Sequence, residues 1–333
     1  MLCRVADSLF WMSRYIERAE NTARLIEVNL QLLVETHYAE EADLEDHWKP
    51  ILESTGDLAL FQQKHARCDS RSVTEFTTFD LENPSSVLSC LSAARENARA
   101  VRDQISPEMW EILNRLYLNL RSSDSKHVWK RGPAQFYQEI KEYSHLFQGV
   151  TEATFPHRAG YEFIKAGKFL ERADKTSRIL GLKHLFERYG DHATGGMVDI
   201  GQWIAILSAC SALEPYHRAY VASVEARNVI AFLLQSRDFP RSVLFCLSQL
   251  QLAIHAISGC PTTHYSNEAE RFCGRLISDL NYAVTEEIMD GGLDTFLDHA
   301  QETIDKIALQ LSQRYMFFPI VDPASAVMEQ KMS

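Results

Sequence analysis

The feature that most constrains the fold of this chain is a repeat within its own sequence. The segment at residues 15–26 returns, in diverged form, 154 positions later at residues 169–180. Two further matches follow in the same order at offsets of 155 and 156: Trp48 with Trp203, and Pro84 with Pro240. Three ordered matches at a nearly constant offset indicate an internal duplication with a seam near residues 154–157. We therefore expect two diverged copies of one unit, over residues 1–154 and 155–316, followed by a tail over residues 317–333.

Each copy is expected to be helical. Residues 6–36 carry apolar side chains at intervals of three and four, the spacing of one face of an α-helix. The chain has only 14 Gly and 10 Pro among its 333 residues, which favours long regular elements over a loop-rich β fold. The predicted fold class is all-α: a bundle-like protein of two tandem, diverged copies of a multi-helix unit.

Several expected helix ends carry local signals. Ser106 before Pro107 and Glu108 predicts a helix start, with Ser as the N-cap and Pro in the first turn. Two more starts are expected from the capping-type spacings Ser72…Glu75 and Asn267…Glu270. Residues 290–292 are interpreted as a loop after which Asp294 caps the last helix, and the Pro-containing tail is expected to be extended.

The composition bounds the compartment and the partners. A net charge of −11 disfavours broad contact with nucleic acid or with an anionic membrane, since both require a basic surface. The first residues do not have the pattern of a signal peptide, and no apolar run approaches the roughly 20 residues that span a bilayer. The seven cysteines are scattered and contain no Cys-x-x-Cys pair, which indicates free thiols in a reducing compartment. We expect a cytoplasmic protein, and the sequence does not determine its oligomeric state.

The first long helix has an unusual charged sector. On a helical wheel, one sector of about 120° holds Arg14, Glu17, Arg18, Asn21 and Arg24. Large apolar residues share that sector, so we expect the helix to be buried on both sides and its charges to be paired. The second copy repeats the motif with Glu171, Arg172 and Arg178.

Two interpretations of these charges stay open. In the first, Glu17 and Glu171 form buried ion pairs that fix how the helices of each unit pack. In the second, the charges line a polar groove that binds a ligand.

A row of arginines favours the groove in the N-terminal copy. Arg95, Arg99 and Arg102 stand at i, i+4 and i+7, and they repel one another unless acids such as Glu17, or an anionic ligand, offset them. A solvated basic face is the alternative interpretation. The second copy has Gln251 and Ala253 at the positions aligned with Arg95 and Asn97, so a single site is expected in the first copy. The candidate polar groove comprises Glu17, Arg18, Asn21, Arg24, Arg95, Asn97, Arg99 and Arg102.

The longest motifs resemble those of a known family. Residues 4–21, 94–99 and 170–174 are similar to the bacterial α-E domain family, a predicted α-helical domain named for its Glu-Arg motif. The likeness extends over nearly the whole chain and weakens over residues 39–78 and the tail. Members of that family are typically encoded beside, or fused to, circularly permuted ATP-grasp proteins and transglutaminase-like proteases. The resemblance therefore implies these two partners and a role in making or trimming amide bonds, but it supplies no catalytic residue.

Motifs for bound cofactors and metals are not found in the sequence. It has no Gly-rich phosphate loop with Lys and Ser/Thr, so any ATP chemistry is expected from a partner. Glu142…His145 and Glu214…His217 have the Glu-x-x-His spacing of di-metal bundles, but they do not align between the copies. His127, His157 and His255 are interpreted as surface or core residues, and we expect no metal and no cofactor.

Two functions of different classes follow. The first is an accessory or scaffold component of an ATP-grasp-linked system that forms amide or peptide bonds. The alternative is an enzyme or binder in its own right, which holds an anionic amino-acid or acyl-phosphate ligand with the Glu and Arg cluster of the N-terminal copy. Whether the chain is an enzyme stays open.

Overall fold

The computed structural model describes residues 1–36, 41–189, 197–220 and 223–316. Within these ranges it contains helices and connections but no strand, which confirms the all-α, bundle-like class. The helices are α1 (Cys3–Thr36), α2 (Glu41–Ser54), α3 (Leu58–Lys64), α4 (Ser70–Thr78), α5 (Val87–Ala100), α6 (Pro107–Arg121), α7 (Ser125–Arg131), α8 (Pro133–Thr154), α9 (Ala159–Arg188), α10 (Met197–Ala209), α11 (Leu213–Ala219), α12 (Ala226–Gln235), α13 (Val243–Ser258), α14 (Glu268–Tyr282), α15 (Thr285–Asp290) and α16 (Leu293–Leu311), with a π-helical turn at Ser312–Met316. In these ranges we find no helix with the length and apolar character that a membrane crossing requires. The predicted tail lies outside the described residues.

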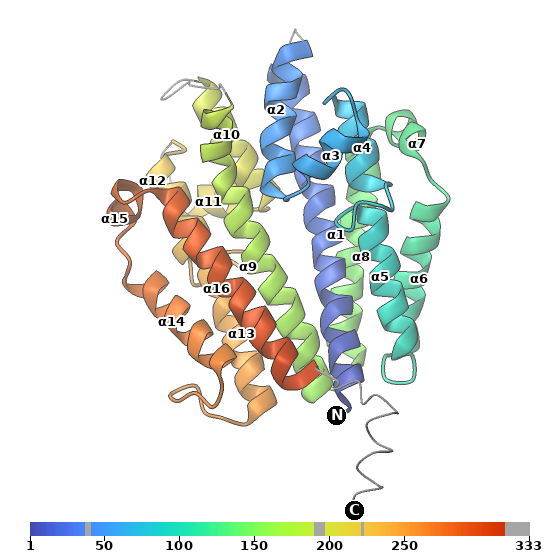
Figure 1. Ribbon diagram of the computed structural model, residues 1–333, viewed down its shortest axis with the longest axis vertical. Helices are drawn as coiled ribbons and strands as arrows, with labels where there is room; N and C mark the ends of the chain where they lie inside the picture. Colours follow the sequence, from blue (N-terminus) through green and yellow to red (C-terminus); the bar gives the residue numbers. More distant parts are fainter. Residues whose placement is uncertain (37–40, 190–196, 221–222, 317–333) are drawn as a thin grey trace, which may run out of the picture.

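The two helices that carry the Glu-Arg motifs, α1 and α9, lie side by side through the centre of the molecule (Figure 1). Their close approach depends on Gly167 of α9. A Cβ atom at this position would lie only 2.3 Å from the backbone carbonyl oxygen of Phe10 in α1. Any other residue here would push the two helices apart, because the obstructing carbonyl belongs to the backbone and cannot rotate away as a side chain can.

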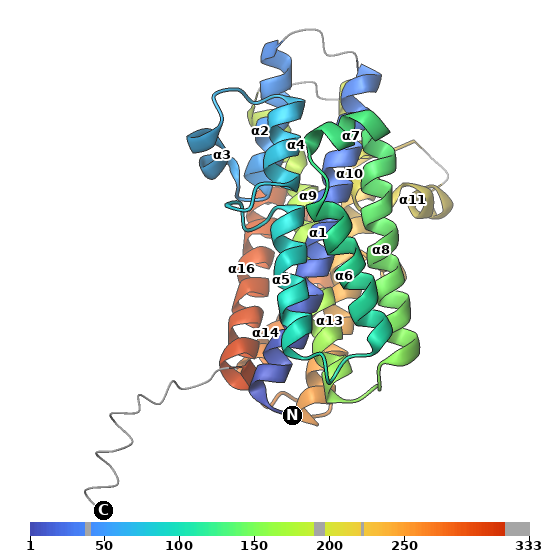
Figure 2. The same cartoon turned by 90° about the vertical axis from the view of Figure 1, so that its right-hand side faces the viewer.

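Each central helix belongs to a set of four packed helices (Figures 1 and 2). Helix α1 packs with α5 and α8, and α6 packs between those two; α9 packs with α13 and α16, and α14 packs between those two. Two further helices connect the sets: α2, which follows α1, packs against α9, and α10, which follows α9, packs against α1. Buried apolar side chains of both sets form one continuous core.

Local geometry also recurs at the aligned positions. Ser86 and Ser242 are the N-caps of α5 and α13, and each side chain accepts a hydrogen bond from the backbone N–H three residues later. The Cys90 thiol donates to the Pro84 carbonyl (3.6 Å), as the Cys246 thiol does to that of Pro240 (3.5 Å). The duplication and its boundary near residue 154 stay predictions; the chain passes from α8 to α9 through residues 155–158.

The helix ends confirm some local predictions and correct others. Ser106 caps α6 and Asn267 caps α14, as predicted. The predicted Ser72…Glu75 box is wrong: Asp69 is the cap of α4, and Ser72 is its capping-box partner in the first turn. Asp294 does not cap α16 either, because the helix begins after Gly292 and Asp294 already lies in its first turn.

Candidate functional site

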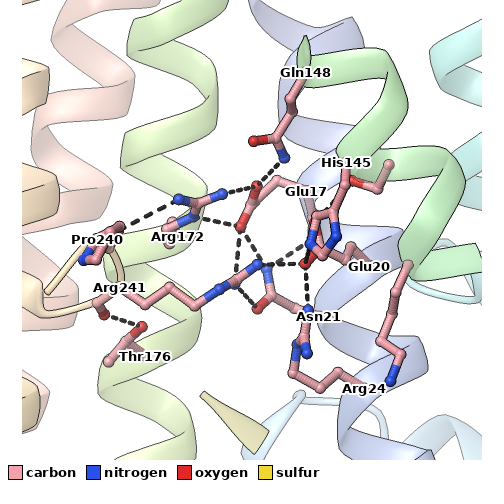
Figure 3. Close-up of polar contacts among 12 residues, drawn as sticks. Glu17, Glu20, Asn21, Arg24, His145, Gln148, Arg172, Thr176, Pro240 and Arg241 are labelled. Carbon is pink, nitrogen blue, oxygen red and sulfur yellow. Dashed lines mark hydrogen bonds and ion pairs between the residues drawn. The ribbon is translucent and has the colours of Figure 1, made fainter. Parts of the chain in front are cut away.

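The Glu17 carboxylate of α1 is held from the opposite helix set (Figure 3). Arg172 of α9 grips it with two hydrogen bonds, from Nε to Oε1 (2.7 Å) and from Nη2 to Oε2 (2.9 Å). Arg241, in the connection between α12 and α13, donates from Nη1 to Oε1 (3.2 Å) and to Oδ1 of Asn21 (3.1 Å). Gln148 of α8 donates a weaker bond to Oε2 (3.3 Å). The side chain of Glu17 is 1% exposed, so these partners replace water.

Glu20, one turn further along α1, extends the same network. Arg24 donates to its Oε1 (2.6 Å), and Arg241 forms a second ion pair with that oxygen. From α8, Ser144 donates to Oε2 (2.8 Å), and His145 Nε2 lies 3.2 Å from Oε1. Two buried carboxylates thus meet three buried guanidinium groups, and Arg241 bridges both acids.

Glu171 of α9 has the reciprocal arrangement with α1. Arg14 donates from Nε to its Oε2 (2.8 Å), and Arg18 donates to both carboxylate oxygens (2.6 and 3.0 Å). The guanidinium of Arg14 also lies over the ring of Trp11, 4.6 Å from its centroid. Each Glu-Arg motif therefore supplies the acid for one cross-helix cluster and an arginine for the other. We call the contacts of Glu17, Glu20 and Glu171 with their arginines, together with the hydrogen bonds of Asn21, the α1–α9 clamp.

The charges of the clamp keep its carboxylates ionised. Burial raises the pKa of Glu17, but the adjacent Arg172 and Arg241 outweigh it and hold the pKa below its ordinary value. The pKa of Glu171 is likewise lowered, because Arg14 and Arg18 overcome the effect of burial. Ionised carboxylates whose oxygens already accept from two arginines each are poorly placed to take up protons or attack a substrate.

Open space beside the clamp is small. A cavity of about 30 Å³ adjoins Glu17 and is lined by residues that include Gln148, Thr151 and Lys168. That volume holds roughly one or two water molecules, whereas ligand pockets typically measure about 300 Å³ or more. Burial, aided by the nearby Arg172, lowers the pKa of Lys168, whose ammonium lies 4.5 Å from the ring centroid of Phe169.

The structure divides the residues of the predicted groove between two places. Glu17, Arg18, Asn21 and Arg24 belong to the clamp, whereas Arg95 of α5 and Arg102, just after the end of α5 at Ala100, contact α6. Arg95 donates to Asn114 (2.7 Å) and Glu96 (3.0 Å) and lies between the rings of Trp110 and Tyr117. Arg99 pairs with Glu96 (2.7 Å), Arg102 lies over Trp110, and Asn97 donates to the backbone of its own helix. Glu96, rather than Glu17, offsets this row. In α9, Arg178 pairs with Asp174 of its own helix (2.9 Å).

Sequence reasoning missed two members of the clamp, Glu20 and Arg241. Glu20 lies within residues 4–21, which carry the family resemblance. Its spacing from Glu17 does not reveal that the two acids share one arginine. Arg241 was visible as a difference between the aligned segments, because the residue aligned with it is Ser85. A charge present in only one of the two aligned segments, directly before a helix, was the available signal.

Neither of the two Glu-x-x-His spacings belongs to the group of potential metal ligands that the described residues bring together. His145 contacts Glu20, and the Glu214…His217 pair lies on the short helix α11. In the described ranges, one group has side chains close enough to share an ion: His255, Cys260 and Glu270.

The fold and the clamp define an all-helical protein whose paired Glu-Arg motifs join two helix sets. The chain belongs to the Alpha-E family: the family model, described as a predicted alpha-helical domain with a conserved ER motif, matches residues 1–316. Uncharacterised proteins of Mycobacterium bovis and Mycobacterium tuberculosis are 23% identical to it over 305 residues, which is 87% of this chain and 34% of theirs. The chain thus spans about a third of the length of these curated relatives. No solved structure matches it significantly.

Proposed function

We propose that this chain is an accessory or scaffold component of an ATP-grasp-linked system that forms amide or peptide bonds. Its partners would be a circularly permuted ATP-grasp protein and a transglutaminase-like protein, which the family resemblance implies. The observation that carries the scaffold role is the α1–α9 clamp. Both motif carboxylates are almost fully buried, and each is held by arginines of the opposite helix.

A clamp of this kind suits a structural role for the motif. Buried ion pairs fix one registry of two helices, because any slip would leave a charge unpaired in the core. An active site needs a reacting group that substrate can reach, and Glu17 lies beside a cavity that holds only about one or two waters.

The length of the mycobacterial relatives also supports the proposal. In those proteins the region similar to this chain makes up 34% of the sequence. A helical unit that stands within much longer chains is well suited to act next to other domains.

The arginines in α5 and directly after it form the surface at which we place a partner contact. Arg99 and Arg102 are exposed, and Arg95 and Arg102 stack on Trp110 of α6. Arginine and aromatic side chains are the residue types that dominate binding energy at protein interfaces. We call Arg95, Arg99, Arg102, Trp110 and Tyr117 the α5–α6 strip, and propose that it contacts an acidic surface of the ATP-grasp protein.

The alternative function, a binder of an anionic amino-acid or acyl-phosphate ligand, rests on the same strip. Its guanidinium groups could bind a small carboxylate or phosphate in place of a protein surface. Direct titration of the purified chain with glutamate or acetyl phosphate separates the two: the scaffold proposal expects no binding to the isolated chain.

The test of the proposal is an affinity pull-down from native cells, with bound proteins identified by mass spectrometry. We expect the wild-type chain to recover the ATP-grasp and transglutaminase-like proteins, and the Arg99→Ala/Arg102→Ala variant to lose the ATP-grasp protein. Arg271→Ala is the matched control, because Arg271 also stacks on an aromatic ring and pairs with an exposed acid, but on α14. A wild-type pull-down without either protein would contradict the proposal.

A further inference from the structure

Three potential metal ligands converge where α13 passes into α14. His255 lies in the last turn of α13, Cys260 in the connection, and Glu270 in the first turn of α14. A ring nitrogen of His255, the Cys260 sulfur and a carboxylate oxygen of Glu270 all lie within 4.8 Å of one another. This group shares no residue with the α1–α9 clamp, and His255 lies at the opposite end of α13 from the clamp residue Arg241.

The protein holds two of these side chains in the orientation that a metal ligand needs. His255 Nδ1 lies 3.0 Å from the backbone carbonyl of Cys260, which can only accept, so Nδ1 carries the proton. Nε2 then has a free lone pair, and a histidine ligand is commonly fixed through its other nitrogen in this way. Glu270 accepts from the backbone N–H of Ser266 (2.6 Å) and from Asn267 Nδ2 (2.8 Å). These bonds position its carboxylate.

Accessibility also favours a cation. Cys260 is partly exposed, whereas Cys90, Cys246 and Cys273 are fully buried. An ion and the solvent that takes up the thiol proton can therefore reach this sulfur.

We propose that His255, Cys260 and Glu270 form a binding site for a zinc ion. Imidazole nitrogen, thiolate sulfur and carboxylate oxygen are the three donor types that Zn²⁺ accepts, at about 2.0–2.3 Å. Mg²⁺ and Ca²⁺ prefer oxygen ligands alone. On binding, the Cys260 S–H bond breaks, its proton passes to solvent and a Zn–S bond forms. Three protein ligands leave the fourth tetrahedral position for water or another small ligand.

The short connection favours closure of the site. Gly259 ends α13 in the left-handed conformation (φ 75°), and Cys260 follows it directly. Cys260 therefore lies directly after the last turn of α13, which carries His255. The sequence did not reveal the group, because its members are 5 and 10 positions apart and match no compact zinc motif.

The experiment measures zinc in the untagged, full-length chain. The protein is dialysed against Zn²⁺ and then against metal-free buffer, and its metal content is determined by mass spectrometry. We expect about one zinc per chain, and at least tenfold weaker binding for Cys260→Ser and for His255→Gln in a chelator competition. Cys3→Ser is the matched control, since Cys3 is the other partly exposed thiol, and it should bind as the wild type does.

Cobalt substitution keeps the test independent of folding defects. Co²⁺ bound by a thiolate gives a sulfur-to-cobalt charge-transfer band, which the wild type and Cys3→Ser should show and Cys260→Ser should lack. Far-ultraviolet circular dichroism checks that each variant is folded. Wild-type protein without bound zinc, or Cys260→Ser protein with undiminished affinity, would overturn the proposal. Neither result bears on the scaffold function, which does not involve these residues.

Discussion

The two acids of the clamp occupy matching positions but different surroundings. Glu17 meets arginines from two elements, Arg172 of α9 and Arg241 before α13, and both side chains are 8% exposed. Glu171 meets Arg14 and Arg18, both from α1, and Arg18 is 18% exposed. On the Glu17 side a second buried acid, Glu20, shares Arg241, whereas on the Glu171 side the buried Asp174 shares only the more distant Lys175, 3.4 Å from Asp174 and 3.9 Å from Glu171.

This difference shows how the same motif can contribute unequally to stability at two places in one molecule. The reciprocal pairing of α1 with α9 depends on residues present in both motifs. The additional buried ion pairs on the Glu17 side depend on Arg241, and the residue aligned with Arg241 is Ser85. The Glu17 side should therefore contribute more to stability, and substitutions can test that ranking.

The largest effect is expected from Glu17→Gln. It leaves Arg172 buried without a full charge partner, and breaking a buried pair in this way costs about 3–5 kcal/mol. Glu171→Gln should cost about 1 kcal/mol less, because Arg18 can turn toward water and retain part of its hydration. Urea denaturation of both variants measures the two free energies of unfolding. A larger loss for Glu171→Gln would reverse our ranking.

Arg241→Ser should have the next largest effect. The change places at this position the residue type found at Ser85, while Glu17 keeps Arg172 and Glu20 keeps Arg24. We expect a loss of about 1.5–3 kcal/mol, the range for hydrogen bonds to charged groups. The same denaturation measurement checks it, with exposed Arg227→Ala as the control. A loss no larger than that of the control would remove Arg241 from the clamp.

An effect that is absent at neutral pH and grows on acidification is expected at His47. Burial lowers its pKa to about 4, while a hydrogen bond to the backbone of Asn29 acts in the opposite direction. The unfolded chain therefore takes up a proton that the folded chain excludes, and stability falls by about 1.4 kcal/mol per pH unit from about 6.5 down to about 4. His47→Gln, which introduces the residue type of the aligned Gln202, should flatten this part of the stability curve.

Measurements at lower pH provide the control for His47. The pKa values of Glu17 and Glu171 are lowered in the folded state, so their contribution is present above about 4.5 and declines as the pH falls below it. Below about pH 4, where His47 is protonated in both the folded and the unfolded chain, the wild type and His47→Gln should lose stability equally. An unchanged slope between pH 6.5 and 4.5 in His47→Gln would contradict the assignment.

The smallest effect on stability is expected from Arg95→Ala. Its acid partner Glu96 is 48% exposed, and ion pairs at such positions contribute about 0–1 kcal/mol. A thermal melt should show a shift of a few degrees at most. Unfolding of this variant would instead make the α5–α6 strip a structural element and withdraw it as a contact surface.

Much of the fold could be predicted because it depends on local pattern. The apolar spacing of residues 6–36 predicted the first helix to within three residues of its start at Cys3, and Ser106 and Asn267 marked helix starts correctly. Where two cap residues compete, as at Asp69 and Ser72, spacing alone does not decide which one receives the backbone N–H groups.

The site was harder to predict because its contacts join distant segments. The mixed sector of α1 indicated that Glu17 is buried and paired, but its partners lie 155 and 224 positions away. Helical spacing also placed Arg95, Arg99 and Arg102 on one line, but α5 ends at Ala100, before Arg102. The spacing also did not show that α6, rather than α1, lies against Arg95 and Arg102. Tertiary packing decides both, and it is not encoded in the period of one helix.

The central claim, that the Glu-Arg motifs clamp α1 to α9, is tested most directly by a double-mutant cycle of Glu17→Gln and Arg172→Gln. Its control is the cycle of Glu17→Gln and Arg18→Gln, which pairs neighbours on one helix. The clamp predicts a coupling of about 2 kcal/mol or more for Glu17 with Arg172, and a value within about 0.5 kcal/mol of zero for Glu17 with Arg18. Additive effects of Glu17 and Arg172 would contradict the clamp.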